Sequence, residues 1–177
     1  MDVSREREGL MYTIGDRVVY GIHGVCAVVA IEKRAVDRKQ VEYFALEPLE
    51  QPGTRFYVPT QNQAALAKLR PLISRQELEE LIRSEAARSD NWIADESHRK
   101  QYYRELINSG DRAALLSMVG CLYRHKEEQA ALGRKFHLCD ENFLRDAQKL
   151  LNSEFALVLE LEPGQVGEYL RKNLQVQ

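Results

Sequence analysis

The segment Ile14–Val29 constrains the fold of this chain more than any other stretch. It reads as a short strand, a corner that contains two glycines and a histidine, and a second strand. Val18 and Tyr20 share one face of the first strand, and Val25, Ala27, Val29 and Ile31 continue the alternation after the corner. Gly21 and Gly24 supply the backbone freedom that a sharp turn between strands requires. No catalytic nucleophile or paired acid lies here, so the segment predicts a binding module.

The rest of the first half continues with short strands and turn signals. A charged hairpin follows the second strand, and a Pro-Gly turn precedes a further strand. Four or five short strands in about 60 residues predict a Tudor- or SH3-like β-barrel over residues 11–72, with residues 1–10 as a flexible tail. The expected elements are strands at Val25–Glu32, Val41–Glu47 and Thr54–Val58, a charged hairpin at Lys33–Gln40, helical turns within Gln61–Lys68, and a closing segment at Leu69–Pro71.

From Ser74 onward the apolar period changes from two to 3.6 residues, which is typical of helices. Ser74 and Glu77 form a capping-box pattern, and Asp111 and Asp140 are expected to cap later helices. A helix through His98–Asn108 should stop at Ser109-Gly110, Gly133 should lie at the end of the next helix, and Pro163 suits the first turn of the last one. Residues 73–177 are therefore expected to form an all-α bundle of about five helices, and the chain a two-domain α+β protein.

The net charge of −2 is unevenly divided between the two halves. Residues 11–72 carry eight Lys or Arg against six Asp or Glu, a balance of +2, whereas residues 73–177 carry fifteen against eighteen, a balance of −3. Neutralisation of phosphates by basic side chains supplies most non-specific DNA affinity. The composition therefore argues against strong DNA binding by this chain alone, and any DNA contact would need a second anchor.

The composition also points to a reducing, aqueous compartment. No apolar run approaches the roughly 20 residues that span a bilayer, and the charged residues 1–10 do not resemble a signal peptide. Cys26, Cys121 and Cys139 are odd in number and lack the spacing of a disulfide framework. We therefore expect a cytoplasmic protein without a membrane partner.

Enzyme and metal signatures are weak. The sequence has no P-loop, no dinucleotide-binding glycine motif, no nucleophile elbow and no His-Glu-x-x-His. Cys121, His125, His137 and Cys139 are ligand types that zinc accepts, but their order and spacing match no familiar zinc site. We interpret them as a buried thiol and surface imidazoles, and His23 as a turn residue within the barrel. The expectation is a non-enzyme with no cofactor and no metal, and a zinc-dependent hydrolase or deaminase stays an alternative.

An ordered series of motifs resembles the CarD/CdnL family of bacterial transcription regulators, whose first module also occurs in the transcription-repair coupling factor. The series begins with Gly-Asp-x-Val-Val-Tyr at residues 15–20 and His-Gly-Val at residues 23–25. Gly21 departs from the family, which usually has proline there. The remaining segments of the resemblance are Ala30–Arg34, Glu42–Leu46, Tyr57–Pro59, Leu69–Pro71, Asn91-Trp92, Ser109–Asp111 and Ala147–Ala156.

In the helical half, the resemblance implies a role for the only tryptophan. A Trp at the Asn-Trp position of such proteins is a wedge at the upstream edge of the melted promoter, and an indole can stack on an unpaired base. Without the resemblance, Trp92 would more often anchor the segment that precedes the next helix. Arg99, Lys100 and Arg104 are the candidates for phosphate contacts, and the alternative for each is a solvated helix face.

In the barrel, Arg34 matches a family arginine that contacts RNA polymerase, and its planar fork suits a carboxylate on a partner. The second family arginine is replaced here by Tyr57, and Arg55 could substitute for it. An exposed edge strand could also pair with a partner strand. The alternative is a solvated charged hairpin.

Together these features predict a regulator that binds the β subunit of RNA polymerase through its barrel and promoter DNA through its bundle. The resemblance implies that it stabilises the open complex without choosing a sequence. A rival is a polymerase-docking adaptor whose acidic bundle binds another protein. The oligomeric state stays open, with a monomer favoured.

Overall fold

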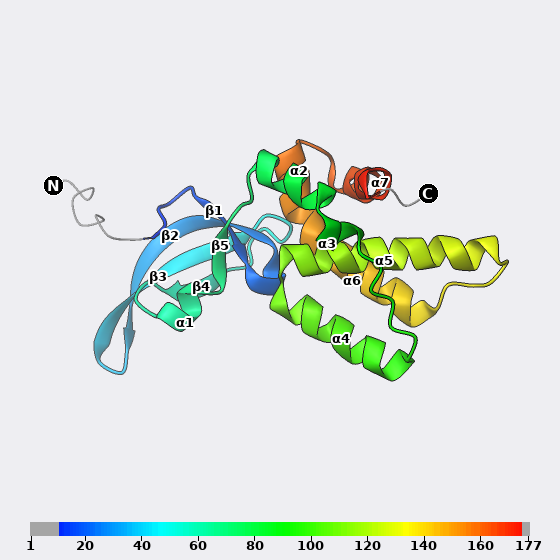
Figure 1. The fold of residues 1–177 in the computed structure, drawn as a ribbon. Helices are drawn as coiled ribbons and strands as arrows, with labels where there is room; N and C mark the ends of the chain where they lie inside the picture. Colours follow the sequence, from blue (N-terminus) through cyan, green and yellow to red (C-terminus); the bar gives the residue numbers. More distant parts are fainter. Residues whose placement is uncertain (1–10, 175–177) are drawn as a thin grey trace. The chain divides into compact units, whose positions relative to one another are not determined.

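The computed structural model describes residues 11–174 and separates the chain into two compact units that meet between Leu72 and Ile73. We call residues 11–72 the sheet unit and residues 73–174 the helical unit. The first contains a five-stranded antiparallel sheet and the second contains several helices, which confirms the α+β class (Figure 1). The predicted tail at residues 1–10 lies outside the described residues.

The sheet unit is built from consecutive antiparallel strands in the order β4-β3-β2-β1-β5. This order leaves β4 and β5 as the two edge strands. The closing segment expected at Leu69–Pro71 is β5, which pairs with β1. The elements are β1 (Arg17–Tyr20), the 3₁₀ turn η1 (Gly21–His23), β2 (Val25–Val36), β3 (Lys39–Pro48), β4 (Phe56–Pro59), α1 (Gln63–Leu66) and β5 (Leu69–Pro71).

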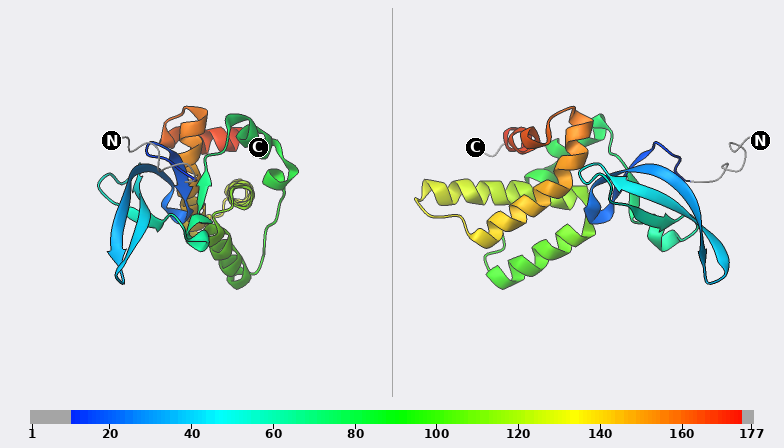
Figure 2. Two further views of the ribbon diagram at one scale, coloured as in Figure 1. Left: turned by 90° about the vertical axis from the view of Figure 1, so that its left-hand side faces the viewer. Right: turned by 180° about the vertical axis from the view of Figure 1, so that it is seen from behind.

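The β2–β3 hairpin is longer than the sequence predicts (Figure 2). The sequence predicts a charged hairpin at Lys33–Gln40 between strands that end at Glu32 and resume at Val41, but the ladder continues to the pair Val36↔Lys39. Only Asp37 and Arg38 form the turn, with φ of 49° and 64°. Positive φ at both central residues is the conformation that a two-residue hairpin loop needs to match strand twist. The hairpin is observed, but its strands were predicted too short, because backbone pairing, rather than side-chain polarity, decides where this ladder ends.

The core of the sheet unit lies on one face of the sheet. Gly21 and Gly24 have φ of 47° and 73°, so the corner between β1 and β2 does use the left-handed region that glycine tolerates. Cys26 and Val28 of β2 point into the core, whereas the period-two pattern placed Val25, Ala27 and Val29 on that face. This prediction was wrong because strand pairing sets Cys26, not Val25, opposite Val18, and only after the irregularity between Val28 and Ala30 does Ile31 pack against the core. The buried cluster consists of Val18, Cys26, Val28, Phe44, Leu46, Val58, Leu66 and Leu69.

The helical unit begins and ends its helices mostly where the capping residues predict. Ser74 and Glu77 form the expected capping box, and the Asp111 carboxylate accepts a hydrogen bond of 2.8 Å from the Ala114 N–H. Gly110 ends α4 with a φ of 61°. The helices are α2 (Arg75–Arg83), α3 (Glu85–Arg88), α4 (Glu96–Ser109), α5 (Arg112–Ala131), α6 (Leu138–Leu159) and α7 (Pro163–Asn173).

Asp140 does not cap α6, and that prediction was wrong. The helix begins two residues earlier, at Leu138, and Asp140 lies buried in its first turn. Its carboxylate binds the side chain of Arg99 on α4. The Asp140 carboxylate therefore forms an ion pair between α4 and α6 instead of capping the start of α6.

None of the described helices is both long enough and apolar enough to cross a membrane.

The apolar faces of the helices meet in a single core. Trp92, in the segment between α3 and α4, packs against this core from its edge. The largest fully buried side chains of the core are Tyr103, Phe155, Leu78, Leu115, Leu116, Leu122, Leu151, Leu170 and Leu174.

Candidate functional sites on the two units

The structure brings the three candidate residues of the sheet unit together. The Arg34 guanidinium lies over the ring of Tyr57, with 3.4 Å between its Cζ and the ring centroid. Arg34 also donates to the Glu32 carboxylate at 3.1 Å. Arg55 lies 3.7 Å from the carboxylates of both Glu32 and Glu47. We call these five residues the arginine–tyrosine face.

The arginine–tyrosine face is accessible and only loosely held. The side chains of Arg34 and Arg55 are 44% and 47% exposed. Ion pairs with this exposure contribute little to stability, so either arginine can exchange its internal carboxylate for one on a partner. The Tyr57 ring supports the Arg34 guanidinium by a cation–π contact, which holds the fork in place. The face is thus a surface suited to recognising a carboxylate.

Glu32 and Glu47 are members of this face that sequence reasoning missed. Glu32 stands two residues before Arg34 on β2, a spacing that puts both side chains on the same side of a strand. That spacing was a usable signal. Glu47 joins from β3, and its proximity to Arg55 depends on pairing between strands, which no local pattern reveals.

In the helical unit, Trp92 is held in a stack of side chains from different elements. Its ring lies 3.5 Å from that of His125 on α5, at an interplanar angle of 18°, and 4.3 Å from the Arg99 Cζ on α4. We call Trp92, His125 and Arg99 the tryptophan stack. Trp92 is only partly buried, so one part of the ring stays at the surface. This geometry matches the anchoring alternative, with the indole already engaged.

Arg99 does not lie where a phosphate could reach it. It is 5% exposed and makes two hydrogen bonds to Asp140, of 2.9 and 3.0 Å, and one of 2.8 Å to the Ile93 carbonyl. Burial by itself lowers the pKa of this guanidinium, but the hydrogen bond and the charge of Asp140 hold the pKa above its usual value. The expected phosphate contact is replaced by a structural role, because the charge is already paired inside the unit.

Lys100 and Arg104 lie on the outside of α4. Lys100 forms an ion pair with Glu96 one turn earlier, and the hydrogen bond between them raises the pKa of Lys100. Arg104 is exposed, and within residues 11–174 its side chain has no hydrogen bond or ion pair. The two cations are four residues apart and share a face of the helix. Of the three candidate phosphate contacts, these two remain available at the surface.

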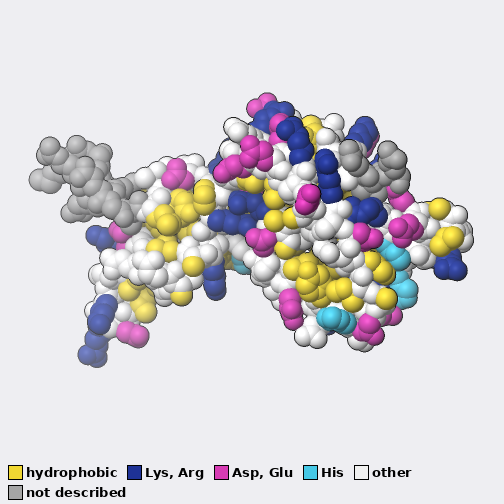
Figure 3. Space-filling model, viewed as in Figure 1, with side chains coloured by type: hydrophobic (Ala, Val, Ile, Leu, Met, Phe, Trp, Pro, Cys, Tyr) yellow, Lys and Arg dark blue, Asp and Glu magenta, His cyan; other side chains and the backbone are white. Residues whose placement is uncertain are grey.

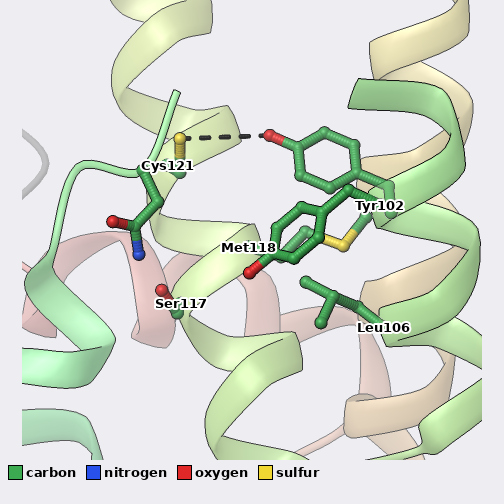
Figure 4. Close-up of a pocket in the computed structure, with 7 residues that line it drawn as sticks. Tyr102, Leu106, Ser117, Met118 and Cys121 are labelled. Carbon is green, nitrogen blue, oxygen red and sulfur yellow. Dashed lines mark hydrogen bonds between the residues drawn. The ribbon is translucent and has the colours of Figure 1, made fainter. Parts of the chain in front are cut away.

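A small cavity between α4 and α5 borders the segment that carries Trp92 (Figure 4). Its volume is about 10 Å³, which holds at most one water molecule. Tyr103 donates to the Cys121 sulfur at 4.0 Å, and Cys121 donates to the Asp90 carboxylate at 3.4 Å. The lining residues are Asn91, Tyr102, Tyr103, Leu106, Ser117, Met118 and Cys121. The cavity is too small for an organic substrate.

The histidines and cysteines of the zinc alternative are dispersed. Within the described part of the chain, no group of three or more His, Cys, Asp or Glu side chains could hold a metal ion. Burial raises the pKa of the Cys121 thiol to about 11, so the thiol is protonated near neutral pH. His125 faces the indole of Trp92. His23 packs in the sheet unit, 4.2 Å from the ring of Phe56.

Comparison with protein families identifies the sheet unit. Residues 12–73 match the family model described as the CarD-like/TRCF RID domain. The matched residues include the whole arginine–tyrosine face. Such a domain implies interaction with RNA polymerase, and proteins of this domain family are typically non-catalytic regulators. Most of the helical unit lies outside the match. The chain therefore carries a CarD-like/TRCF RID domain at residues 12–73, as expected of a protein of the CarD/CdnL family.

Proposed function

We propose that this protein is a transcription regulator that binds the β subunit of RNA polymerase and promoter DNA at the upstream edge of the bubble. It then stabilises the open complex without sequence specificity. The observation that carries the proposal is the assembly of Arg34, Arg55 and Tyr57 on one accessible face of a RID domain.

Two features of the sheet unit support binding to polymerase. The exposed guanidinium groups can form bidentate hydrogen bonds with carboxylates of the β subunit. The edge strand β4 pairs with β3 on one side, so its other side can add a strand of the partner by backbone hydrogen bonding. Tyr57 belongs to β4, and the two modes of contact therefore adjoin.

Tethering explains how a helical unit with a net negative charge can act on DNA. Once the sheet unit is bound, the helical unit meets promoter DNA at a high effective concentration, so weak contacts suffice. Lys100 and Arg104 are the proposed phosphate contacts, and the exposed part of Trp92 is the proposed contact with the melted edge. Only a higher affinity for the melted promoter than for the closed one can shift the population toward the open complex.

Replacing Arg34 by alanine tests the polymerase contact. We expect the Kd of the full chain for RNA polymerase to rise at least tenfold, because a central arginine that pairs with carboxylates is worth about 2 kcal/mol or more at an interface. Surface plasmon resonance with immobilised polymerase measures the change. The matched control is Arg17→Ala, an exposed arginine of β1, which should bind as the wild type does. Equal affinity of Arg34→Ala and Arg17→Ala contradicts the proposed face.

A second candidate is an adaptor that docks on polymerase while its helical unit binds another protein. The specific observation in its favour is that the Trp92 ring is already stacked on His125 inside the unit. The acidic balance of residues 73–177 points the same way.

The variant Trp92→Leu separates the two candidates, because leucine fills apolar space but cannot stack on a base. If Trp92 contacts melted DNA, the lifetime of the open complex should shorten by about tenfold, as a stacked base contributes about 1–3 kcal/mol. Decay of heparin-challenged open complexes measures this lifetime. Polymerase affinity serves as the control and should not change. An unaltered lifetime together with retained polymerase binding favours the adaptor.

A further inference from the structure

The loop between α5 and α6, residues 132–137, exposes more large apolar surface than its length requires. Leu132 at its start is 62% exposed, and Leu138, directly after it, is 71% exposed. Among the described residues, Met11 and Ile22 are the other large apolar side chains that are more than half exposed. Two large apolar side chains with this exposure, one at each end of a short segment, point to an interaction surface.

The charges of the loop are all of one sign. Arg134 and Lys135 stand between the two leucines, both are exposed, and within residues 11–174 neither side chain has a hydrogen bond or an ion pair. No acidic residue lies between Leu132 and Cys139. Figure 3 shows hydrophobic and basic side chains gathered at this end of the helical unit.

Of the four acidic residues nearest in sequence, two form ion pairs with basic side chains elsewhere in the helical unit. Glu128 lies 3.6 Å from His125, and Glu141 lies 3.0 Å from Lys126. Asp140 is paired with Arg99, and Glu127 is the remaining carboxylate. The loop therefore presents two unpaired cations flanked by apolar side chains.

The loop is also fixed in place beside the tryptophan stack. Phe136 lies 6.2 Å from the ring of His125, which itself stacks on Trp92, and the Lys126 ammonium lies 5.6 Å from the Phe136 ring. These contacts hold the middle of the loop against α5. The leucines are thus displayed from an anchored loop, and a partner binds them without ordering a free segment first.

We propose that the α5–α6 loop is the DNA-inserting element of the helical unit. Arg134 and Lys135 bind backbone phosphates, and Leu132 or Leu138 enters the minor groove and separates a base step. This inference rests on the DNA partner of the proposed function and names the residues that contact it. It also explains how the helical unit can act on DNA while Trp92 keeps its internal partners.

The chemistry of the loop favours DNA over two other occupants. Protein interfaces are poor in lysine and in charged residues at their centre, whereas here Lys135 lies next to a second cation in the middle of the loop. Two leucines bury too little hydrocarbon for stable membrane attachment, since even a single myristoyl chain binds marginally. By contrast, one or two apolar wedges flanked by cations are a common means of binding and kinking the minor groove.

The test uses the full chain with a short duplex that carries a central unpaired bubble, in low-salt buffer, read by fluorescence anisotropy. Leu132→Ser/Leu138→Ser is expected to raise the Kd about tenfold. Arg134→Gln/Lys135→Gln should weaken binding and lower the slope of log K against log salt by about two. The matched controls are Leu49→Ser and Lys149→Gln, both exposed and away from the loop, which should bind as the wild type does.

The outcomes separate this inference from the proposed function. If both loop variants bind the bubble duplex as tightly as the wild type does, the inference is overturned and the proposed function stays intact. Wild-type chain that binds polymerase but no bubble duplex, alone or at a promoter with polymerase, overturns both the DNA role and the inference. The inference is also overturned if the loop variants keep their affinity for DNA and lose only binding to anionic phospholipid vesicles or only binding to polymerase. Because the leucines are exposed, thermal unfolding of the loop variants should match that of the wild type.

Discussion

Replacing Asp140 by alanine should destabilise the helical unit by about 3–5 kcal/mol, the usual cost of leaving a buried charge without its partner. Arg99 would keep its guanidinium in a site that is 5% exposed, with the Ile93 carbonyl as its main remaining acceptor. The pair joins α4 to α6, so its loss should also loosen the stack on Trp92. Urea denaturation followed by far-ultraviolet circular dichroism measures the free energy of unfolding.

Two further variants sharpen that test. Asp146→Ala removes an exposed carboxylate from the same helix and should have little effect. Arg99→Met/Asp140→Leu replaces both charges by apolar groups of similar size, and it should recover most of the lost stability. If Asp140→Ala unfolds at the same urea concentration as Asp146→Ala, the pair does not hold the two helices together.

Glu154→Ala should have an effect of similar size, about 3–5 kcal/mol. Glu154 is 1% exposed, and its carboxylate accepts bonds of 2.8 and 2.6 Å from Arg112 and one of 2.8 Å from the Ile73 N–H. It thereby joins the start of α5 to the residue that precedes the capping box of α2. The midpoint of thermal unfolding should fall by more than about 10 °C, since 1 kcal/mol corresponds to roughly 4–8 °C for a unit of this size, and differential scanning calorimetry measures it.

The control for this prediction is Glu168→Ala on α7, which breaks an exposed ion pair with Lys172 and should unfold as the wild type does. Glu154→Gln keeps the shape of the side chain and removes its charge, so it should fall between the two. Equal unfolding midpoints for Glu154→Ala and Glu168→Ala would show that this buried carboxylate contributes nothing beyond an exposed one.

The parts of the fold that the sequence predicted are those determined by local chemistry. Ser74, Asp111 and Pro163 each begin a helix through contacts within one turn, and such contacts can be read from spacing alone. The alternation in β2 was assigned to the wrong face, because the register that sets Cys26 opposite Val18 depends on strand pairing and not on neighbouring residues. The extent of the β2–β3 ladder was missed because the pairing of two strands continues regardless of side-chain charge.

The candidate sites divide in the same way. Arg34, Arg55 and Tyr57 could be selected from family-like motifs, and the sheet brought them together. The role of Arg99 could not be anticipated, because its partner Asp140 is 41 residues away in the sequence. The contact of Trp92 with His125 depends in the same way on how α5 packs in the helical unit. Where a side chain's partner is distant, local patterns supply candidates but not their roles.

The tryptophan stack gives this protein an intrinsic optical reporter. Trp92 is the only tryptophan in the chain, so its emission arises from one known place, where an imidazole and a guanidinium lie against the ring. Any event that shifts α4, α5 or the nearby loop must change the intensity or wavelength of that emission. The binding of a partner to this end of the helical unit can therefore be followed without attaching a dye.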